Sequence, residues 1–165
     1  MPNTEETVVA AFYKFVDWND FKDLKSPLAK VCSKAGTVGT ILLAPEGING
    51  TIAGTVQGVQ TVLEFLCNDQ RLINLTPKYS TATGKTFKRM KIKIKKEIVS
   101  MGKVEAKPAR VTGTFVTPDA WNKEIADPDT VVIDARNYYE YSVGTFTYSI
   151  QLNTKSFREF PECVD

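Results

Sequence analysis

The sequence predicts an α+β protein whose first part is a βαββαβ unit. Three observations carry this prediction. Apolar, β-rich stretches flank two stretches with helical spacing, two of the predicted strands are close enough in sequence to form a hairpin, and a strictly alternating basic stretch follows as an extra strand. A segment rich in Gly, Pro and Lys then separates this unit from a second one.

The first strand and the first helical region occupy residues 8–35. Val8 to Phe15 is apolar and β-rich, which is typical of a central strand. From residue 18 to residue 35 apolar side chains recur at helical spacing, and Ser26-Pro27 has the residue types of an N-cap and first turn. The pattern predicts two short helices that meet near Ser26, the second ending at Gly36.

A hairpin is predicted in the middle of the unit. Ile41 to Ala44 is an apolar run typical of a buried strand, and Thr51 to Ala53 supplies its partner. Between them, Asn49-Gly50 tolerates positive φ at both positions and therefore suits the tight turn. The motif residues Glu46, Gly47, Asn49 and Gly50 are accordingly expected to have structural roles.

A second helix and a fourth strand complete the unit. Thr55 is predicted to cap a helix that carries its apolar residues on one face: Val56, Val59, Val62, Leu63 and Leu66. Leu72 to Ser80 is predicted to form the fourth strand.

The extra strand lies between Phe87 and Val99 and is strongly basic. Lys91, Lys93 and Lys95 alternate with Met90, Ile92 and Ile94, which predicts a half-buried strand with a lysine row on its open face. Residues 85–110 hold ten basic and two acidic side chains, a local charge of +8, whereas the whole chain carries only +2. The candidate RNA-binding residues are Lys85, Lys88, Arg89, Lys91, Lys93, Lys95 and Lys96.

Two interpretations of this basic stretch stay open on the residues alone. Lysines on an outer strand can simply prevent the sheet edge from pairing with other chains. The same row can also contact the phosphates of RNA, in which case binding would depend strongly on salt.

Composition limits the chemistry that the chain can perform. It contains no histidine, so neither a Ser-His-Asp triad nor a two-histidine iron site can be built from it. Its three cysteines are widely spaced and predict neither a zinc cluster nor a disulfide framework. We predict no metal site, no cofactor and no catalytic residue. No apolar run is long enough to span a membrane and no signal peptide is apparent, so a cytoplasmic protein without membrane contact is expected.

Domain boundaries are predicted from the change in composition. We expect a first domain at residues 1–101, a linker at 102–113 and a second domain from 114 to 165. In the second part, Thr117-Pro118 begins a short helix, and Thr130 to Arg136 is a buried strand that ends in the charged pair Asp134 and Arg136. These two side chains are expected to form a structural ion pair.

Four ordered motifs resemble one known family, the rhodanese-related tRNA uridine hydroxylases. The segment from Ala44 to Thr51 contains the family's EGINGT signature. Tyr13-Lys14-Phe15, the basic stretch from Phe87 to Val99 and the segment Ser156 to Pro161 match in the same order. The resemblance covers the chain from about Val8 to Pro161.

The resemblance implies a ferredoxin-like first domain, the start of an α/β rhodanese-like second domain, and tRNA as the partner. The family hydroxylates the wobble uridine of certain tRNAs at carbon 5 with molecular oxygen, through a cysteine in a loop of the rhodanese-like domain. The chain is expected to stop before that loop, so Cys163 does not correspond to the nucleophile. An incomplete rhodanese-like part would expose apolar surface, which makes self-association an expectation.

Three other functions remain open at this point. A rhodanese-like domain can transfer sulfur rather than support hydroxylation. The chain can also act as a non-catalytic module that binds RNA or protein. Acylphosphatase activity is the weakest alternative, because no glycine-rich anion loop with an arginine follows the first strand.

Overall fold

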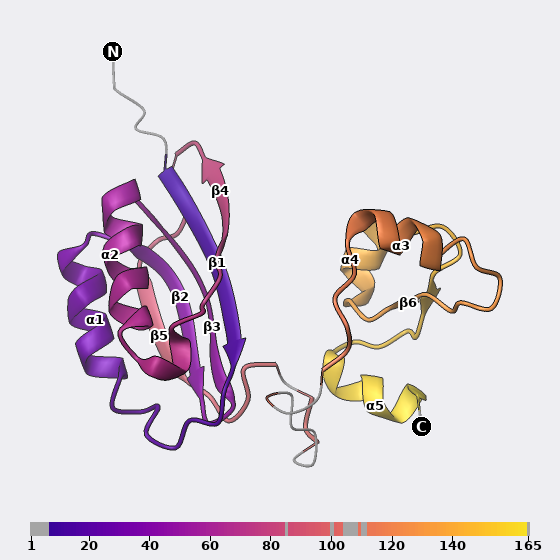
Figure 1. Cartoon of the computed structure of the whole chain (residues 1–165), viewed down its shortest axis with the longest axis horizontal. Coiled ribbons are helices and arrows are strands. Elements are labelled where there is room, and N and C mark those ends of the chain that lie inside the picture. The colour runs from indigo at the N-terminus through magenta and orange to yellow at the C-terminus, as the bar shows by residue number, and fades with distance from the viewer. Residues whose placement is uncertain (1–6, 85, 100, 104–108, 110–111, 165) are drawn as a thin grey trace. The chain divides into compact units, whose positions relative to one another are not determined.

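The first unit is built around a five-stranded sheet with two helices on one face (Figure 1). The computed structural model describes residues 7–84, 86–99, 101–103, 109 and 112–164. The strands are β1 (Thr7–Phe15), β2 (Val38–Ala44), β3 (Gly47–Gly54), β4 (Lys78–Ala82) and β5 (Met90–Ile94). Their order is β4-β1-β3-β2-β5; β5 pairs with β2 in parallel, and the other three pairings are antiparallel. The predicted α+β class and the extra basic strand are confirmed.

The helices of this unit are α1 (Lys25–Lys34) and α2 (Val56–Cys67), followed by the short 3-10 helix η1 (Gln70–Leu72). The prediction of two helices before Gly36 is wrong. Residues 19–24 form turns, and α1 begins after Leu24 rather than at Ser26. The turns persist because Trp18 and Phe21 are buried and the Trp18 N–H donates to the Pro45 carbonyl at 2.8 Å, so tertiary contacts override the helical spacing.

The hairpin between β2 and β3 turns at Pro45-Glu46, not at Asn49-Gly50. Ala44 pairs with Gly47, which leaves Asn49 and Gly50 inside β3. Gly47 has φ +139°, and a Cβ there would lie 2.0 Å from the Lys14 carbonyl oxygen on β1. The glycine of the turn is therefore required by close approach of the neighbouring strand as well as by backbone conformation.

Gly50 has a packing role within β3. A Cβ at this position would lie 2.8 Å from Cζ of Phe12, so the ring occupies the space that a side chain would need. Asn49-Gly50 thus lies within a strand, and Gly50 is required there by the Phe12 ring rather than by turn geometry.

The fourth strand is shorter and later than predicted. Leu72 ends η1 and Leu75 follows it, and both side chains are buried. Asp69 caps η1 by accepting from the Arg71 N–H at 2.9 Å. Because the two leucines pack into the core from a 3-10 helix and the loop after it, pairing with β1 begins only at Lys78.

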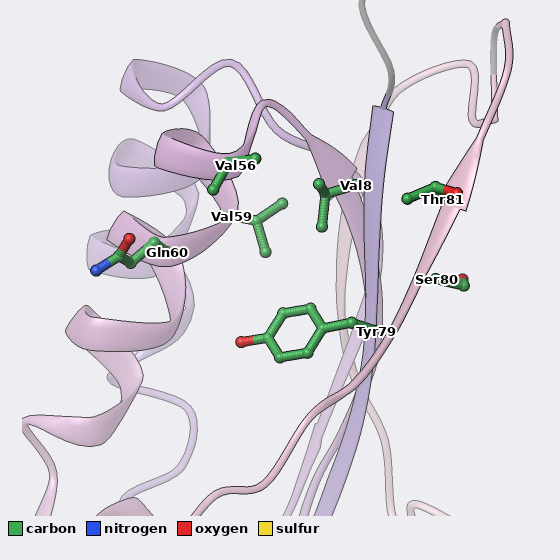
Figure 2. A pocket seen from close by; sticks show the side chains of 7 residues that line it. All are labelled: Val8, Val56, Val59, Gln60, Tyr79, Ser80 and Thr81. Atoms are coloured by element: carbon green, nitrogen blue, oxygen red, sulfur yellow. The ribbon is translucent and has the colours of Figure 1, made fainter.

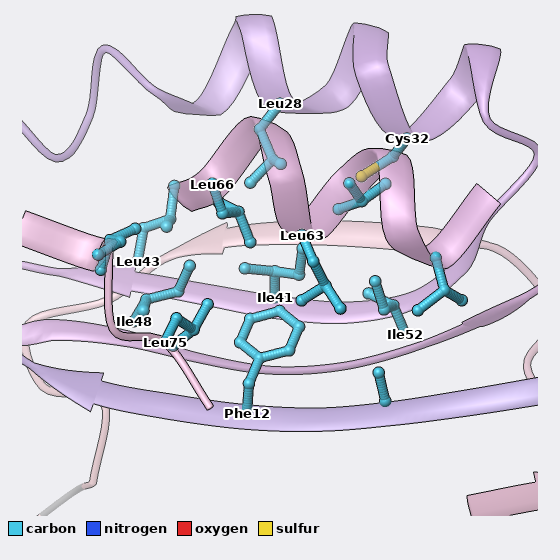
Figure 3. Close-up of a cluster of buried hydrophobic side chains, with 14 of the residues drawn as sticks. Phe12, Leu28, Cys32, Ile41, Leu43, Ile48, Ile52, Leu63, Leu66 and Leu75 are labelled. Carbon is cyan, nitrogen blue, oxygen red and sulfur yellow. The ribbon is translucent and has the colours of Figure 1, made fainter. Parts of the chain in front are cut away.

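The core lies between the sheet and the two helices (Figure 3). Ile41, Leu43, Ile48 and Ile52 are fully buried on the helix-covered face of β2 and β3. The predicted cap of α2 is confirmed, since the Thr55 hydroxyl accepts from the Gly58 N–H at 3.0 Å. The apolar residues predicted on one face of α2 are buried except Val56, which is exposed.

The connection from β4 to β5 runs from one edge of the sheet to the other. Ala82 ends the strand that flanks β1, and Met90 begins the strand that flanks β2. Thr86, Phe87 and Lys88 line a pocket together with Thr7, Val38 and Gly54 from the ends of three strands.

The second unit comprises most of the chain from Val99 onward. It contains α3 (Pro118–Glu124), β6 (Ile133–Asp134), α4 (Tyr138–Val143), β7 (Ile150–Gln151), the 3-10 helix η2 (Phe157–Glu159) and α5 (Phe160–Val164). β6 and β7 pair in parallel. The helix predicted at Thr117-Pro118 is confirmed, but the strand predicted from Thr130 to Arg136 is regular over only two residues.

Among the described residues, no helix has the length and apolarity that crossing a membrane requires. The predicted linker at 102–113 falls partly outside the described residues, which omit 104–108 and 110–111.

Candidate nucleic-acid interface

The basic strand β5 forms one edge of the sheet and presents two lysines on the face opposite the helices. Met90, Ile92 and Ile94 pack against the core, so the alternate residues Lys91 and Lys93 point away from it and are exposed. The alternation predicted from the sequence is therefore the alternation of the strand.

The other candidate residues flank β5. Lys88 and Arg89 precede it, Lys95 and Lys96 follow it, and all four are exposed. The Gly39 N–H donates to the Arg89 carbonyl at 3.4 Å and the Lys95 N–H donates to the Leu43 carbonyl at 2.8 Å, which continues the pairing with β2 at both ends. Lys85 lies outside the described residues.

The hairpin turn anchors the chain that leaves β5. The Ile98 N–H donates to the Glu46 carboxylate at 2.6 Å, and the Ile98 side chain is buried. The carbonyls of Pro45 and Glu46 accept from the N–H groups of Trp18 and Val16, at 2.8 and 3.0 Å. One two-residue turn thus fixes both the chain after β1 and the chain after β5, so the EGINGT signature supports the basic strand without contributing a positive charge.

Sequence reasoning missed two aromatic side chains on the same open face. Tyr13 and Phe15 lie two residues apart on β1, out of step with the core residues Ala10 and Phe12. Tyr13 is 49% exposed, and its ring centroid lies 6.0 Å from that of Phe15 in an edge-to-face arrangement. The two-residue period of a strand indicates this placement, because positions 13 and 15 of β1 lie on the face opposite Phe12.

The loop after β1, where an acylphosphatase-like anion site would be sought, is acidic. It contains Asp17, Asp20 and Asp23. The nearby Arg71 is bound by two carboxylates: its guanidinium forms an ion pair with Asp20 and lies 2.7 Å from Asp69. Its Cζ also lies 5.1 Å from the ring centroid of buried Trp18. Arg71 therefore stabilises the loop, and its charge is already neutralised.

The two ion pairs of Arg71 with Asp20 and Asp69, here called the Arg71 clamp, make the stability of the first unit depend on pH. Hydrogen bonds from Arg71 lower the pKa of both Asp20 and Asp69 below the ordinary value, so these carboxylates stabilise the fold above about pH 4 and lose that effect as pH falls further. In urea unfolding at pH 6 and pH 3, we expect Arg71→Met to be less stable than wild type at pH 6. The difference between the two proteins should shrink at pH 3. A difference that is equal at both pH values would contradict this role for the ion pairs.

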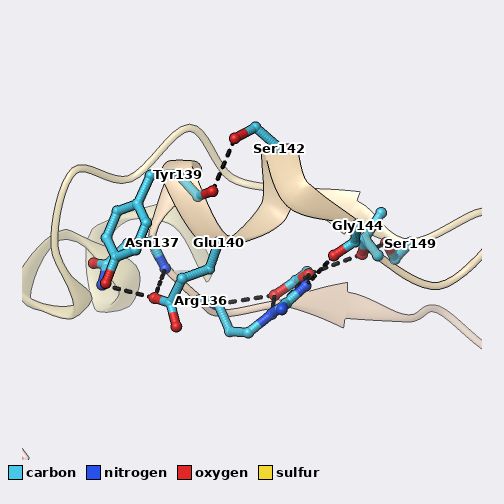
Figure 4. A network of polar contacts seen from close by, with 9 residues as sticks. Arg136, Asn137, Tyr139, Glu140, Ser142, Gly144 and Ser149 are labelled. Atoms are coloured by element: carbon cyan, nitrogen blue, oxygen red, sulfur yellow. Dashed lines mark hydrogen bonds and ion pairs between the residues drawn. The ribbon is translucent and has the colours of Figure 1, made fainter.

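Asp134 and Arg136 form the centre of a polar network in the second unit (Figure 4). Arg136 Nη2 lies 2.6 Å from Asp134 Oδ2 and donates to the Gly144 carbonyl at 2.7 Å, and the Thr145 hydroxyl donates to Asp134 at 2.8 Å. Hydrogen bonds from Arg136 hold the pKa of Asp134 well below its usual range. The network joins the end of β6 to the segment after α4. With its charges paired internally, it fits a structural role.

Other candidate sites offer little chemistry. Cys32 is buried, which raises the pKa of its thiol, and Cys163 is exposed with its Sγ 3.9 Å from the Leu152 carbonyl. Within the described part of the chain, no three His, Cys, Asp or Glu side chains are grouped to hold a metal ion. A pocket between α2 and β4 is lined mainly by apolar groups, including Val8, Val56 and Val59, with the Tyr79 ring at its side (Figure 2).

Comparison with known proteins gives consistent matches. Residues 7–98 match the family model described as the UPF0176 acylphosphatase-like domain. The chain is 50% identical over 157 residues to a protein of Acaryochloris marina named tRNA uridine(34) hydroxylase, with 95% of this chain and 51% of that protein covered. Proteins of the same name from Sinorhizobium medicae and Picosynechococcus are 48% and 46% identical, over 95% and 97% of this chain and 50% and 54% of theirs. The chain therefore spans about half the length of the curated relatives that it matches.

Proposed function

The chain belongs to the family of the UPF0176 acylphosphatase-like domain, and on that premise we propose that it is the RNA-binding part of a tRNA-modifying protein. The observation that carries the proposal is the lysine pair of β5, which is held on an open sheet face by apolar residues beneath it and by the hairpin at its end. An exposed row of lysines suits contact with a phosphate backbone.

The reaction that we propose for the whole protein is oxygen-dependent hydroxylation of the wobble uridine at carbon 5. The support is the name of the relatives, tRNA uridine(34) hydroxylase, together with the four sequence motifs. We assign binding of the tRNA to this chain and no chemical step. The proposed location is the cytoplasm, since the proposed substrate is tRNA.

We further propose that the second unit is the start of a rhodanese-like domain and that it self-associates. The assignment to a rhodanese-like domain is supported by the order of its elements: β6, the Asp134–Arg136 pair, the capped α4 and the parallel β7. Ile133 and Ile150, which pair in this small sheet, are 41% and 49% exposed. Covering such apolar strand residues with protein would stabilise them.

The test of RNA binding is a salt series with unmodified tRNA and a variant in which Lys91, Lys93 and Lys95 are changed to glutamine. Each lost phosphate contact lowers the slope of log affinity against log salt by about one, so the variant should lose a slope of about two to three and about tenfold or more in affinity. Fluorescence anisotropy with labelled tRNA measures both.

The matched control changes Lys25, Lys30 and Lys34 to glutamine. These lysines are exposed on α1, and their loss changes the net charge by the same amount. The control should bind like wild type. If both variants lose affinity equally, net charge rather than the β5 row governs binding, and if wild type binds no tRNA the proposed function is wrong.

A further inference from the structure

We propose that the open face of the first unit's sheet is a stacking platform for unpaired RNA nucleotides, with Tyr13 and Phe15 as the base-stacking residues. This inference rests on the proposed function and specifies which part of an RNA this face recognises. It concerns the face opposite α1 and α2, which both pack on the other side of the sheet (Figure 1).

The aromatic pair has the placement that stacking requires. Tyr13 is half-exposed, so its ring is available, while its backbone is held by pairing with Asn49 of β3. Phe15 follows on the same strand face, where it pairs with Gly47 and its ring lies edge-to-face with that of Tyr13. Rigid aromatic side chains on a sheet surface stack unpaired bases, as in the four-stranded sheets of RNA-recognition modules.

Polar groups and lysines lie on the same face in register with the aromatic strand. Two rows of paired residues run across β1, β3, β2 and β5: Tyr13, Asn49, Leu42 and Lys93 in one, and Ala11, Thr51, Thr40 and Lys91 in the other. Each row spans about 14 Å, three strand spacings. Each row starts on β1, the strand that carries Tyr13 and Phe15. It continues over an amide or hydroxyl that can form a hydrogen bond with a base edge, and it ends at a lysine that can bind a phosphate.

This order of chemical groups fits unpaired RNA better than a duplex. In a helix the bases are stacked on each other, and their faces are closed to a flat protein surface. In a loop the bases can be splayed onto aromatic rings while the backbone follows the positive edge of the sheet. The ligand that we propose for this face is therefore a single-stranded RNA segment, such as the loop of a tRNA.

The experiment compares Tyr13→Leu with wild type for binding to a labelled single-stranded RNA of seven nucleotides and to a duplex RNA of equal charge. Wild type should bind the single strand more tightly. Tyr13→Leu should lower that affinity about fivefold or more, because stacking of one base is lost, while the salt slope stays unchanged. Tyr13→Phe keeps the ring and should bind like wild type.

Tyr79→Leu is the matched control. Tyr79 is a tyrosine on strand β4 that is 63% exposed, but it lies on the helix-covered side and lines the pocket with Val59. It should leave RNA affinity unchanged. Irradiation of RNA that contains 5-iodouridine should cross-link the peptide that carries Tyr13 and Phe15, and not the peptide that carries Tyr79.

The outcomes separate this inference from the proposed function. If the lysine variant loses affinity but Tyr13→Leu binds like wild type, the tRNA-binding role stands and the platform is refuted. If Tyr13→Leu lowers thermal stability without changing RNA affinity, Tyr13 serves only in packing against Phe15, which also refutes the platform. If wild type prefers the duplex, the lysines bind phosphates without a stacking site.

Discussion

Replacing Gly47 by alanine is expected to lower the free energy of unfolding of the first unit by about 3 kcal/mol or more. Two costs combine at this position. The backbone has φ +139°, which a residue with a side chain rarely adopts, and the added Cβ would lie 2.0 Å from the Lys14 carbonyl oxygen. Because that contact is with backbone, relief requires β1 and β3 to separate. Urea unfolding followed by Trp18 fluorescence, in a Trp121→Phe background, measures the change.

Gly36→Ala is the control for the backbone term alone. Gly36 has φ +64° and an added Cβ there would have no atom within 4 Å. Its cost should be only about 1 kcal/mol, the usual penalty for a left-handed residue. If Gly47→Ala costs no more than this, close approach of the strands is not the reason for a glycine in the turn.

Phe12→Ala is expected to cost about 3 to 5 kcal/mol, because it removes a buried ring from the centre of the core. The ring is 3% exposed. It fills the space above Gly50, where a Cβ would lie 2.8 Å from Phe12 Cζ and 3.1 Å from Ile41 Cγ1. Gly50→Ala alone should therefore overpack the core and cost about 1 to 3 kcal/mol.

The two substitutions should not be additive. Once the ring is gone, the new methyl at position 50 enters the cavity, and alanine also restricts the unfolded chain more than glycine does. Gly50→Ala is thus expected to be neutral or stabilising in the Phe12→Ala background, which chemical denaturation of the four proteins will measure. Equal effects of Gly50→Ala in both backgrounds would mean that the ring does not determine the glycine.

The elements that the sequence predicted well are those whose local pattern agrees with their environment. The alternation of Met90, Ile92 and Ile94 with lysines follows the two faces of β5, and Thr55 caps α2 with the geometry that its residue type favours. In both cases the deciding interaction is local, between neighbours in the chain or between one face and solvent.

The errors have a common physical cause, which is contact with residues distant in sequence. Asn49-Gly50 has turn chemistry, but the Phe12 ring demands a glycine inside a strand. Residues 18–24 have helical spacing, but burial of Trp18 and the Arg71 clamp hold them as turns. No local pattern contains this information.

The candidate interface likewise has a part that the sequence predicts and a part that depends on contacts between distant segments. Charge and alternation predict the lysines. Their register with Tyr13 through Asn49 and Leu42 follows instead from the strand order, which no local pattern contains. The hydrogen bond from the Ile98 N–H to Glu46 could not be predicted from the sequence either, since an acidic residue in a turn predicts no particular partner.

The edge-to-edge connection from β4 to β5 limits the length of the chain between them. Four strand spacings separate the two edges, about 19 Å. The eight Cα–Cα steps from Ala82 to Met90 reach at most about 26 to 29 Å when fully extended. The connection is thus a short tether with little slack. An inserted residue can be absorbed as a bulge, but removal of two would bring the reach close to the span and pull the basic strand off β2. The architecture therefore constrains how many residues lie in this segment more tightly than which ones they are.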